Sequence, residues 1–277
     1  MKYHSVLVGL FLIVTFCLAS CGGNTKSDVN VPTEYCEELV KLAEEGNADA
    51  QIQLGKCYAK GDGVEKNDEE ANKWFLKAAE QGNTDAMAEM GNAYLNGWGV
   101  PVDNQEAIKW FQKAADKGNA VAMSNLGVCY EKGLGVKQNY NQAHNYFMKA
   151  AEQGNAPAQL FLGDNYRFHY SRIGIAYDEN EAFKWYLKAA EQGLADAQFQ
   201  VGFSYTLGLG ANRNIPKAIE WYKKAGEQNH ALALYSLGVI YMNGEDVPQD
   251  FNKGLDYFQK SASLGEQKAI DALRRLR

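Results

Sequence analysis

Residues 50–82 read AQIQLGKCYAKGDGVEKNDEEANKWFLKAAEQG, and this stretch decides the fold. Ala50, Leu54 and Tyr58 stand four residues apart, which places them on one face of a helix. A Gly-x-Gly turn follows, and Asn67 with Glu70 then forms a capping pair that begins a second helix. The apolar stripe of that second helix consists of Ala71, Trp74, Phe75 and Ala78. The stretch therefore predicts two helices joined by a tight turn.

The same pattern occurs six times along the chain. A glycine follows the large apolar residue of each predicted first helix, at Gly55, Gly91, Gly127, Gly163, Gly202 and Gly238. The spacings are 36, 36, 36, 39 and 36 residues, and a tyrosine stands three residues after each glycine. A fixed period in this range indicates a solenoid of stacked repeats. We expect each glycine to let the backbone of the partner helix come close.

The repeated unit reads Ala-x-x-x-Leu-Gly-x-x-Tyr-x-x-Gly-x-Gly-Val and then Ala-x-x-Trp-Phe-x-Lys-Ala-Ala-x-x-Gly. It resembles the Sel-1-like repeat, a close relative of the tetratricopeptide repeat. The resemblance implies an all-α fold, a right-handed superhelical α-solenoid of six 36-residue helix-turn-helix repeats. The predicted solenoid spans 32–277, with caps at 32–46 and 266–277 and repeats at 47–82, 83–118, 119–154, 155–193, 194–229 and 230–265.

Residues 1–20 have the features of a signal peptide. Lys2 precedes an apolar run over residues 6–18, which is too short for a comfortable membrane span. The run ends in Leu-Ala-Ser-Cys-Gly-Gly at 18–23, which resembles the bacterial lipobox. The resemblance implies cleavage before Cys21 and lipidation of that cysteine, with residues 21–31 as a flexible tether. The alternative is an ordinary signal peptide whose cleavage site adjoins a cysteine.

Composition and motifs exclude several classes of function. The net charge of -6 and the pI near 5.4 argue against a nucleic-acid binder. The sequence has no Gly-x-Ser-x-Gly, His-Glu-x-x-His or phosphate-binding loop, so we expect no catalytic residues, no metal and no cofactor. Cysteine-rich members of the resembled family have been described as penicillin-binding proteins with β-lactamase activity. This chain lacks their repeated cysteine pairs, and we predict that it is not an enzyme.

In tetratricopeptide-like solenoids the first helices line a concave groove that holds ligands. Carried over to this sequence, the resemblance gives a partner-binding groove in repeats four to six, made of Asp164, Arg167, Phe199, Phe203, Tyr235 and Val239. The aromatic members are candidates to receive a peptide or helix. The alternative is that they only add packing between stacked repeats.

The fourth repeat has three extra residues and lacks the Gly-x-Gly turn. This insertion-loop candidate contains Phe168, His169, Tyr170 and Arg172. Its aromatic and basic side chains could grip a partner. The alternative is a tolerated surface insertion whose aromatic residues pack on the neighbouring repeat.

Two of the cysteines outside the signal peptide are candidates for a disulfide bond. Cys36 and Cys57 each stand about ten residues from the turn at Gly46, so an antiparallel helix pair places them at the same height. Export would expose them to an oxidising compartment. The hypothesis is a Cys36–Cys57 disulfide worth about 2–3 kcal/mol, and the alternative is two buried thiols. Cys129 should stay free.

Three functions remain open. The first, which the resemblance implies, is a lipid-anchored, non-catalytic scaffold of the bacterial cell envelope that binds a protein or peptide in its groove as a monomeric solenoid. The second is an envelope protein that binds peptidoglycan or another glycan through groove aromatics. The third is a β-lactamase-like activity. Gly22 directly after Cys21 favours the outer membrane over the inner membrane, by analogy with enterobacterial sorting.

Overall fold

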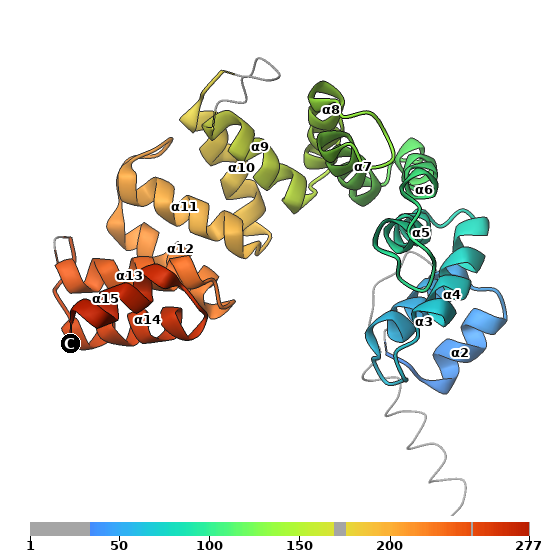
Figure 1. Ribbon diagram of the computed structural model, residues 1–277, viewed down its shortest axis with the longest axis horizontal. Helices are drawn as coiled ribbons and strands as arrows, with labels where there is room; N and C mark the ends of the chain where they lie inside the picture. Colours follow the sequence, from blue (N-terminus) through green and yellow to red (C-terminus); the bar gives the residue numbers. More distant parts are fainter. Residues whose placement is uncertain (1–33, 169–175, 245, 277) are drawn as a thin grey trace, which may run out of the picture. The chain divides into compact units, whose positions relative to one another are not determined.

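The computed structural model describes residues 34–168, 176–244 and 246–276. In these residues every regular element is a helix, fourteen in all, and a short turn joins most neighbours (Figure 1). The signal peptide, Cys21 and the tether lie outside the described residues, as do His169, Tyr170 and Arg172 of the insertion.

The chain divides into two compact units, residues 1–138 and 139–277. The first unit holds α2 (Glu37–Glu44), α3 (Ala48–Lys60), α4 (Asp68–Glu80), α5 (Thr84–Asn96), α6 (Asn104–Asp116) and α7 (Ala120–Lys132). The second holds α8 (Tyr140–Glu152), α9 (Ala156–Arg167), α10 (Glu179–Glu191), α11 (Ala195–Leu207), α12 (Ile215–Glu227), α13 (Ala231–Asn243), α14 (Phe251–Ser263) and α15 (Gln267–Arg275).

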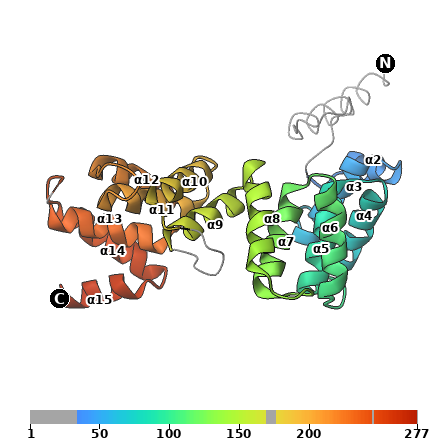
Figure 2. The ribbon, with the colours of Figure 1, turned by 90° about the horizontal axis from the view of Figure 1, so that it is seen from above.

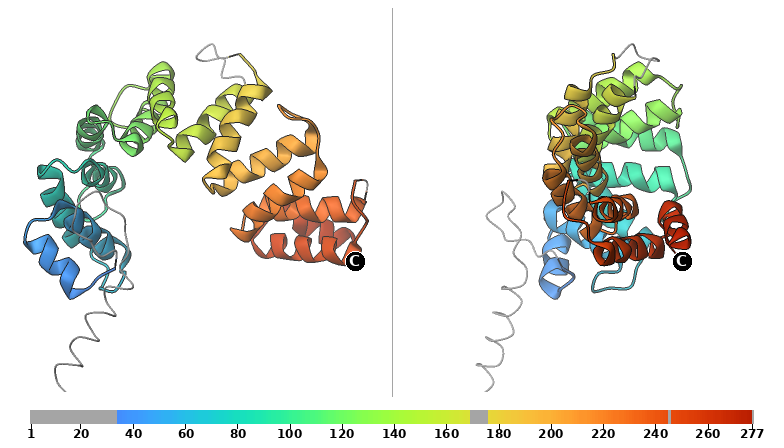
Figure 3. Two further views of the ribbon diagram at one scale, coloured as in Figure 1. Left: turned by 180° about the vertical axis from the view of Figure 1, so that it is seen from behind. Right: turned by 90° about the vertical axis from the view of Figure 1, so that its left-hand side faces the viewer.

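Each unit is a stack of helix pairs in which a helix packs on the helices before and after it in the sequence. In the first unit α3 pairs with α4 and α5 with α6, while α4 packs on α5 and α6 on α7 (Figure 2). In the second unit α9 pairs with α10, α11 with α12 and α13 with α14, and α15 covers α14 at the C-terminus (Figure 3). This arrangement, with α2 and α15 as the end helices, confirms the expected all-α solenoid of helix pairs.

The core of each repeat consists of the predicted stripes. Ala50 and Leu54 are at most 1% exposed, and Trp74 and Phe75 of the second helix are 8% and 5% exposed. Tyr58 is half-buried. Because the stripes of a pair face each other and the next repeat, the buried side chains form a continuous layer within each unit.

The glycine beside the first stripe has a different main neighbour from the one expected. A Cβ atom added at Gly55 would lie 2.5 Å from the ring of Phe75 and 3.2 Å from the carbonyl oxygen of Ala71. The corresponding glycines in repeats two, four, five and six meet the ring of their own second helix in the same way. The glycine therefore makes room chiefly for an aromatic ring rather than for the partner backbone.

The structure forms one of the two hydrogen bonds expected of the capping pairs, and the other is absent in the pair at Asn67 and Glu70. The side chain of Asn67 accepts a hydrogen bond from the Glu70 amide at 3.0 Å, which caps α4. The Glu70 carboxylate does not return to the cap, because it accepts from Lys73 Nζ at 2.7 Å. The backbone N–H of Asn67 donates instead to the carbonyl oxygen of Tyr58 at 2.8 Å. Repeats two and four repeat this scheme, so the cap also ties the second helix to the end of the first.

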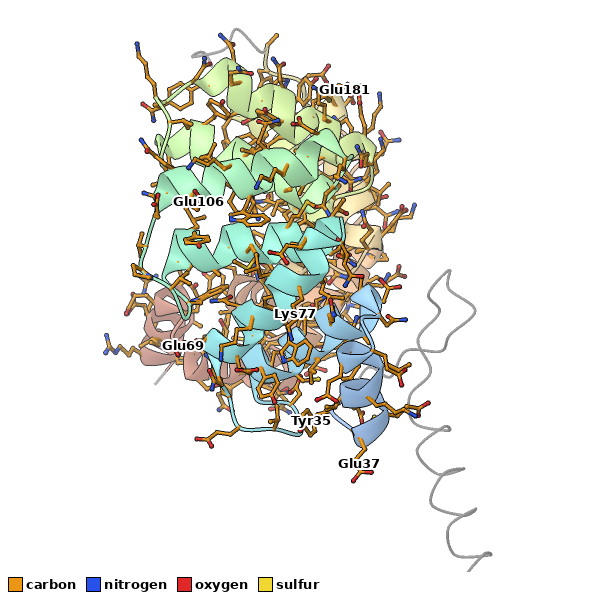
Figure 4. The ribbon with its side chains drawn as sticks, turned by 90° about the vertical axis from the view of Figure 1, so that its right-hand side faces the viewer. Tyr35, Glu37, Glu69, Lys77, Glu106 and Glu181 are labelled. Atoms are coloured by element: carbon orange, nitrogen blue, oxygen red, sulfur yellow. The ribbon has the colours of Figure 1, made fainter. Side chains whose placement is uncertain are left out.

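The outer surface of the repeats is formed by the second helices. Lys77 lies on α4 with its Nζ 3.8 Å from the centre of the Trp74 ring, and Glu69 and Glu106 lie near the N-terminal ends of α4 and α6 (Figure 4). The same lysine-over-tryptophan contact recurs at Lys113, Lys188 and Lys224. The Trp-x-x-Lys spacing, which recurs in four repeats of this chain, thus places a lysine ammonium over the tryptophan ring at the edge of the core.

Candidate interaction surface

The predicted groove residues of the second unit lie on three first helices. Asp164 and Arg167 come from α9, Phe199 and Phe203 from α11, and Tyr235 with Val239 from α13. Arg167 is 7% exposed, whereas the other five are half-buried. We define the aromatic surface as Phe199, Phe203 and Tyr235.

Arg167 joins α9 to α11. Its Nη1 donates to Oε1 of Gln200 at 3.0 Å, and its guanidinium carbon lies 4.7 Å from the centre of the Phe203 ring. Its Nε is 4.0 Å from a carboxylate oxygen of Glu179 at the start of α10. Because this guanidinium is buried among its partners, it supports Phe203 from behind and contributes to packing between repeats four and five.

Asp164 is the hydrogen-bond partner of a buried phenol. The hydroxyl of Tyr186, a fully buried residue of α10, donates to Asp164 Oδ1 at 2.8 Å. Burial raises the pKa of the Asp164 carboxyl, although the bond from Tyr186 and the nearby Arg167 both oppose that shift. Burial likewise raises the pKa of Tyr186. The carboxylate therefore satisfies a polar group inside the repeat.

Sequence reasoning missed this pairing, yet the chain carries a signal for it. The second aromatic residue is phenylalanine in repeats one, two, three and six, and tyrosine only at Tyr186 and Tyr222. Each of these two hydroxyls meets a polar side chain of its own first helix, since Thr206 Oγ1 lies 3.1 Å from the Tyr222 hydroxyl. A tyrosine at this position thus signals a buried hydroxyl that needs a polar partner on the first helix of its own repeat.

The aromatic surface is held from both sides of α11. The rings of Phe199 and Phe203 have centroids 6.2 Å apart. Phe199 also stacks on His230 at 4.8 Å and lies 5.8 Å from Tyr222. These contacts support the packing alternative in part, but both rings keep some exposed area.

The members on α13 pack within the sixth repeat. The Tyr235 ring lies 5.5 Å from that of Phe258. Val239 lines a hollow of about 240 Å³ together with Phe258 and Leu276. The structure thus groups Phe199 and Phe203 with Arg167, and it places Tyr235 and Val239 each beside Phe258. Binding by the six predicted groove residues stays a prediction.

Of the four insertion-loop candidates, the structure describes Phe168, which is 64% exposed. It ends α9 without the left-handed glycine found at Gly61 and Gly97, whose φ angles are 80° and 75°. The guanidinium of Arg167 lies 5.8 Å from its ring. Its role in partner binding stays a prediction.

The two candidate disulfide cysteines belong to one core cluster around Leu39 and Leu54. The structure holds Cys36 and Cys57 as free thiols, the first half-buried and the second buried. Burial raises the pKa of the Cys57 thiol, and it raises the pKa of the Cys129 thiol to about 11. The Cys36–Cys57 bond stays a prediction, and counting three free thiols in a denatured chain that begins after Cys21 would rule it out.

The described residues hold no group of three or more histidine, cysteine or acidic side chains that could bind a metal ion. His144, whose pKa burial lowers, faces Asn165 at 3.5 Å rather than a carboxylate. No helix in the described parts of the chain combines the length and the apolar character that a membrane span requires.

Comparison with known proteins agrees with the repeat geometry. The Sel1 repeat model matches residues 48–83, 84–119, 120–155, 156–194, 195–230 and 231–266, each one residue later than the boundaries expected from the sequence. No curated protein is similar enough to this chain to count as a relative.

Solved structures share the fold. A Sel1 repeat protein from Oxalobacter formigenes is 32% identical with a TM-score of 0.72, over 82% of this chain and 98% of its own. A protective antigen of uropathogenic Escherichia coli with an SLR fold is 30% identical with a TM-score of 0.70, over 84% of this chain. This chain spans about half (49%) of that antigen. An immunity protein from Pseudomonas aeruginosa is 25% identical with a TM-score of 0.52, over 78% of this chain and 81% of its own. The six matched repeats and these structures show that the chain belongs to the Sel1 repeat family.

Proposed function

We propose that this chain is a lipid-anchored, non-catalytic protein-interaction scaffold of the bacterial cell envelope, and that it binds a peptide or protein on the aromatic surface of repeats five and six. Sel1 repeat proteins are generally protein-interaction scaffolds. The observation that carries the location is the set of half-buried aromatic side chains on the first helices α11 and α13.

Aromatic side chains that are fixed in position yet partly open are suited to anchor a partner. Phe203 is backed by Arg167, and Phe199 is fixed between Tyr222 and His230. Since these rings lose little freedom on binding, their remaining exposed area can be buried against a partner at low entropic cost. The first helices of unit one expose less side-chain area to a partner at the positions that correspond to Phe199 and Tyr235. The residues there, Ile52, Ala88 and Ser124, are already buried.

The test is crosslinking in intact cells, followed by affinity purification and mass spectrometry. Wild type is compared with the triple variant Phe199→Ala, Phe203→Ala, Tyr235→Ala. A matched control carries Trp185→Ala, Trp221→Ala and Tyr257→Ala, which removes three aromatic rings from the second helices of repeats four, five and six. We expect a specific protein to be recovered with wild type and with the control but lost with the groove variant, while all three keep their helical circular dichroism.

Two results would contradict the proposed site. Equal recovery of the same protein by wild type and a folded groove variant would remove the aromatic surface from the interaction. Recovery of no specific protein, together with retention on purified sacculi, would favour the glycan-binding function instead.

The lipid anchor is a separate part of the proposal and rests on the sequence around Cys21. We expect labelled palmitate to be incorporated into wild type and not into Cys21→Ser, and the variant to be lost from the outer-membrane fraction. Wild type that stays unlabelled would point to an ordinary signal peptide. Hydrolysis of a chromogenic cephalosporin by the purified chain would contradict the proposal that the protein is non-catalytic.

A further inference from the structure

A preformed hollow lies in the first unit, where repeats one and two meet. It measures about 380 Å³ and is enclosed by α3, α4 and α5 with the turn that follows α5. Its lining includes Lys56, Ala59, Lys60, Phe75 and Trp98. Trp98 is 51% exposed, so the indole forms part of an open rim.

The hollow exists because one residue is small. Ala59 stands four residues after the repeat glycine, where the other repeats have Leu95, Glu131, Arg167, Thr206 and Met242. Repeat one is therefore the repeat that leaves this position nearly empty. Ala71 and Ala93 add two more short side chains to the lining.

The rim is fixed by backbone contacts. Asn72 Nδ2 donates to the carbonyl oxygen of Trp98 at 2.7 Å. A Cβ atom at Gly99 would lie 2.5 Å from the backbone of Asp68, so this turn packs directly on the start of α4. Because the turn is held at both places, the position of Trp98 does not depend on a bound partner.

The equivalent position between repeats four and five shows which kind of side chain can fill the space where two repeats meet. There Arg167 stands where Ala59 does, and its guanidinium reaches Gln200, Glu179 and the ring of Phe203. A long charged side chain of the chain itself therefore occupies the joint. Its charge matches the lining, because Asp164 and Glu179 both lie near it.

The charge of the hollow in repeats one and two is reversed. Lys56 takes the place of Asp164, and Lys60 takes that of Phe168, one helical turn further along α3. Of the other charged lining groups, Lys66 pairs with Asp68 at 3.5 Å. Glu89 accepts a hydrogen bond from the neutral side-chain amide of Asn92 at 3.3 Å and keeps its negative charge. Within the described ranges neither Lys56 nor Lys60 forms an ion pair. The lining thus sets two lysines against one unpaired carboxylate, and its net charge is positive.

We infer that this hollow, which we name the Ala59 hollow, receives an acidic side chain from a peptide segment of a partner protein. The carboxylate meets Lys56 and Lys60, and an adjacent apolar residue of the peptide covers the Trp98 ring. The inference rests on the proposed scaffold role but uses a surface separate from Phe199, Phe203 and Tyr235. The chain then has two recognition surfaces, one in each unit.

The experiment selects random dodecapeptides from a displayed library on the full chain in mild detergent. Enriched peptides are synthesised with a fluorescent label, and their affinity is measured by anisotropy. We expect Asp or Glu next to an apolar or aromatic residue in the enriched set. Ala59→Leu and the pair Lys56→Glu, Lys60→Glu should each weaken binding at least about tenfold, and added salt should weaken wild-type binding.

Matched variants separate the inference from its alternatives. Lys77→Glu with Lys113→Glu makes the same change in net charge on the outer helices and should leave the affinity within about twofold. Ala59→Leu should fold, because Leu95 stands at the same position of repeat two, and circular dichroism checks this. The triple alanine variant of the aromatic surface should keep full affinity for these peptides. Peptide binding at the Ala59 hollow can therefore be confirmed even if the aromatic surface proves to bind no partner.

Three outcomes would overturn the inference. The first is a library that yields no peptide bound more tightly by wild type than by Ala59→Leu. The second is an enriched set without acidic residues. The third is a set whose affinity does not change in Lys56→Glu, Lys60→Glu.

Discussion

At the scale of single residues, the repeat glycine sets how deeply the second-helix ring can enter each pair. At Gly91 an added Cβ would overlap the ring of Phe111, which is fully buried. The ring has no free space to move into, since protein cores are close-packed. The glycine is therefore needed for its missing side chain, and its φ angle is an ordinary helical one.

Gly91→Ala should lower the free energy of unfolding by about 1–3 kcal/mol, because the added methyl overpacks the pair. Gly226→Ala is the control, since the nearest atom to its Cβ is the flexible end of Leu234 at 2.8 Å. That change should be neutral or add up to about 1 kcal/mol, as alanine favours a helix over glycine. Urea unfolding of both variants measures the difference, and equal effects would argue against the tight ring contact.

The half-buried Asp164 gives a dependence of stability on pH. Burial raises its pKa in the folded state, so its contribution is fully present below the ordinary pKa near 4 and is lost as the pH rises through the raised value. Wild type should therefore gain stability relative to Asp164→Asn as the pH falls from 7 toward 4.5. Urea unfolding of both proteins at the two pH values tests this.

Asp246 supplies a control of opposite sign. Arg213 Nη1 donates to its carboxylate at 2.7 Å, and this bond lowers the pKa of Asp246. A lowered pKa gives a contribution that is present above the ordinary pKa and is lost as the pH falls. The difference between wild type and Asp246→Asn should thus shrink, not grow, on acidification. Parallel behaviour of the two aspartates would contradict the assignment for Asp164.

At the scale of helices, the N-cap side chain of three first helices, α5, α7 and α13, does two tasks. Asn119 accepts from the Ala122 amide at 2.8 Å, and its Nδ2 donates to Asp85 of the preceding first helix at 2.7 Å. Asn83 likewise donates to Asp49 of the preceding first helix. In His230 the two ring nitrogens share these roles, since Nδ1 accepts from the Ala233 amide and Nε2 lies beside the Asp196 carboxylate. One side chain thus begins a helix and binds it to its neighbour.

Asn119→Ala should cost about 1–2 kcal/mol of stability, because it removes the cap of α7 and leaves Asp85 without this donor. Asp85→Ala removes only the contact between helices and should cost less. Thermal unfolding of the two variants gives the comparison. A larger loss for Asp85→Ala would show that the cap itself contributes little.

A second joint between helices uses glutamine. Gln159 Nε2 donates to the carbonyl oxygen of Ala151 at 3.0 Å and its Oε1 accepts from Gln192 at 2.8 Å. Repeats one and five have the same pair, Gln51 with Gln81 and Gln198 with Gln228. Repeat six has Leu234 and Leu264 at these places. In these four repeats polar meets polar and apolar meets apolar, which avoids a buried amide without a partner.

At the scale of the whole molecule, a solenoid spreads the effect of a change only to neighbouring repeats. Gly202→Ala places a Cβ 2.7 Å from the Tyr222 ring in repeat five. We expect hydrogen exchange to quicken in α11, α12 and α13 and to stay unchanged in α3 and α4. Mass spectrometry of peptic peptides resolves these segments. Uniform acceleration along the chain would instead indicate one cooperative unit.

The sequence by itself determined the helix pairs, their sixfold repetition, the end helices and the buried stripes at Leu54, Trp74 and Phe75. These features follow from local periodicity and from turn and cap residues, whose effects reach only a few positions along the chain. Repetition then multiplies the signal, since the same pattern appears six times.

Only the tertiary structure decided which side chains meet between helices. The burial of Arg167, the bond from Tyr186 to Asp164 and the Ala59 hollow depend on contacts between residues about twenty or more positions apart. Such contacts depend on side-chain volume and hydrogen-bonding need at each joint, which no single helix pattern contains. The repeat pattern specifies where the helices lie, and the residues that differ between repeats specify which side chains fill the contacts between the helices.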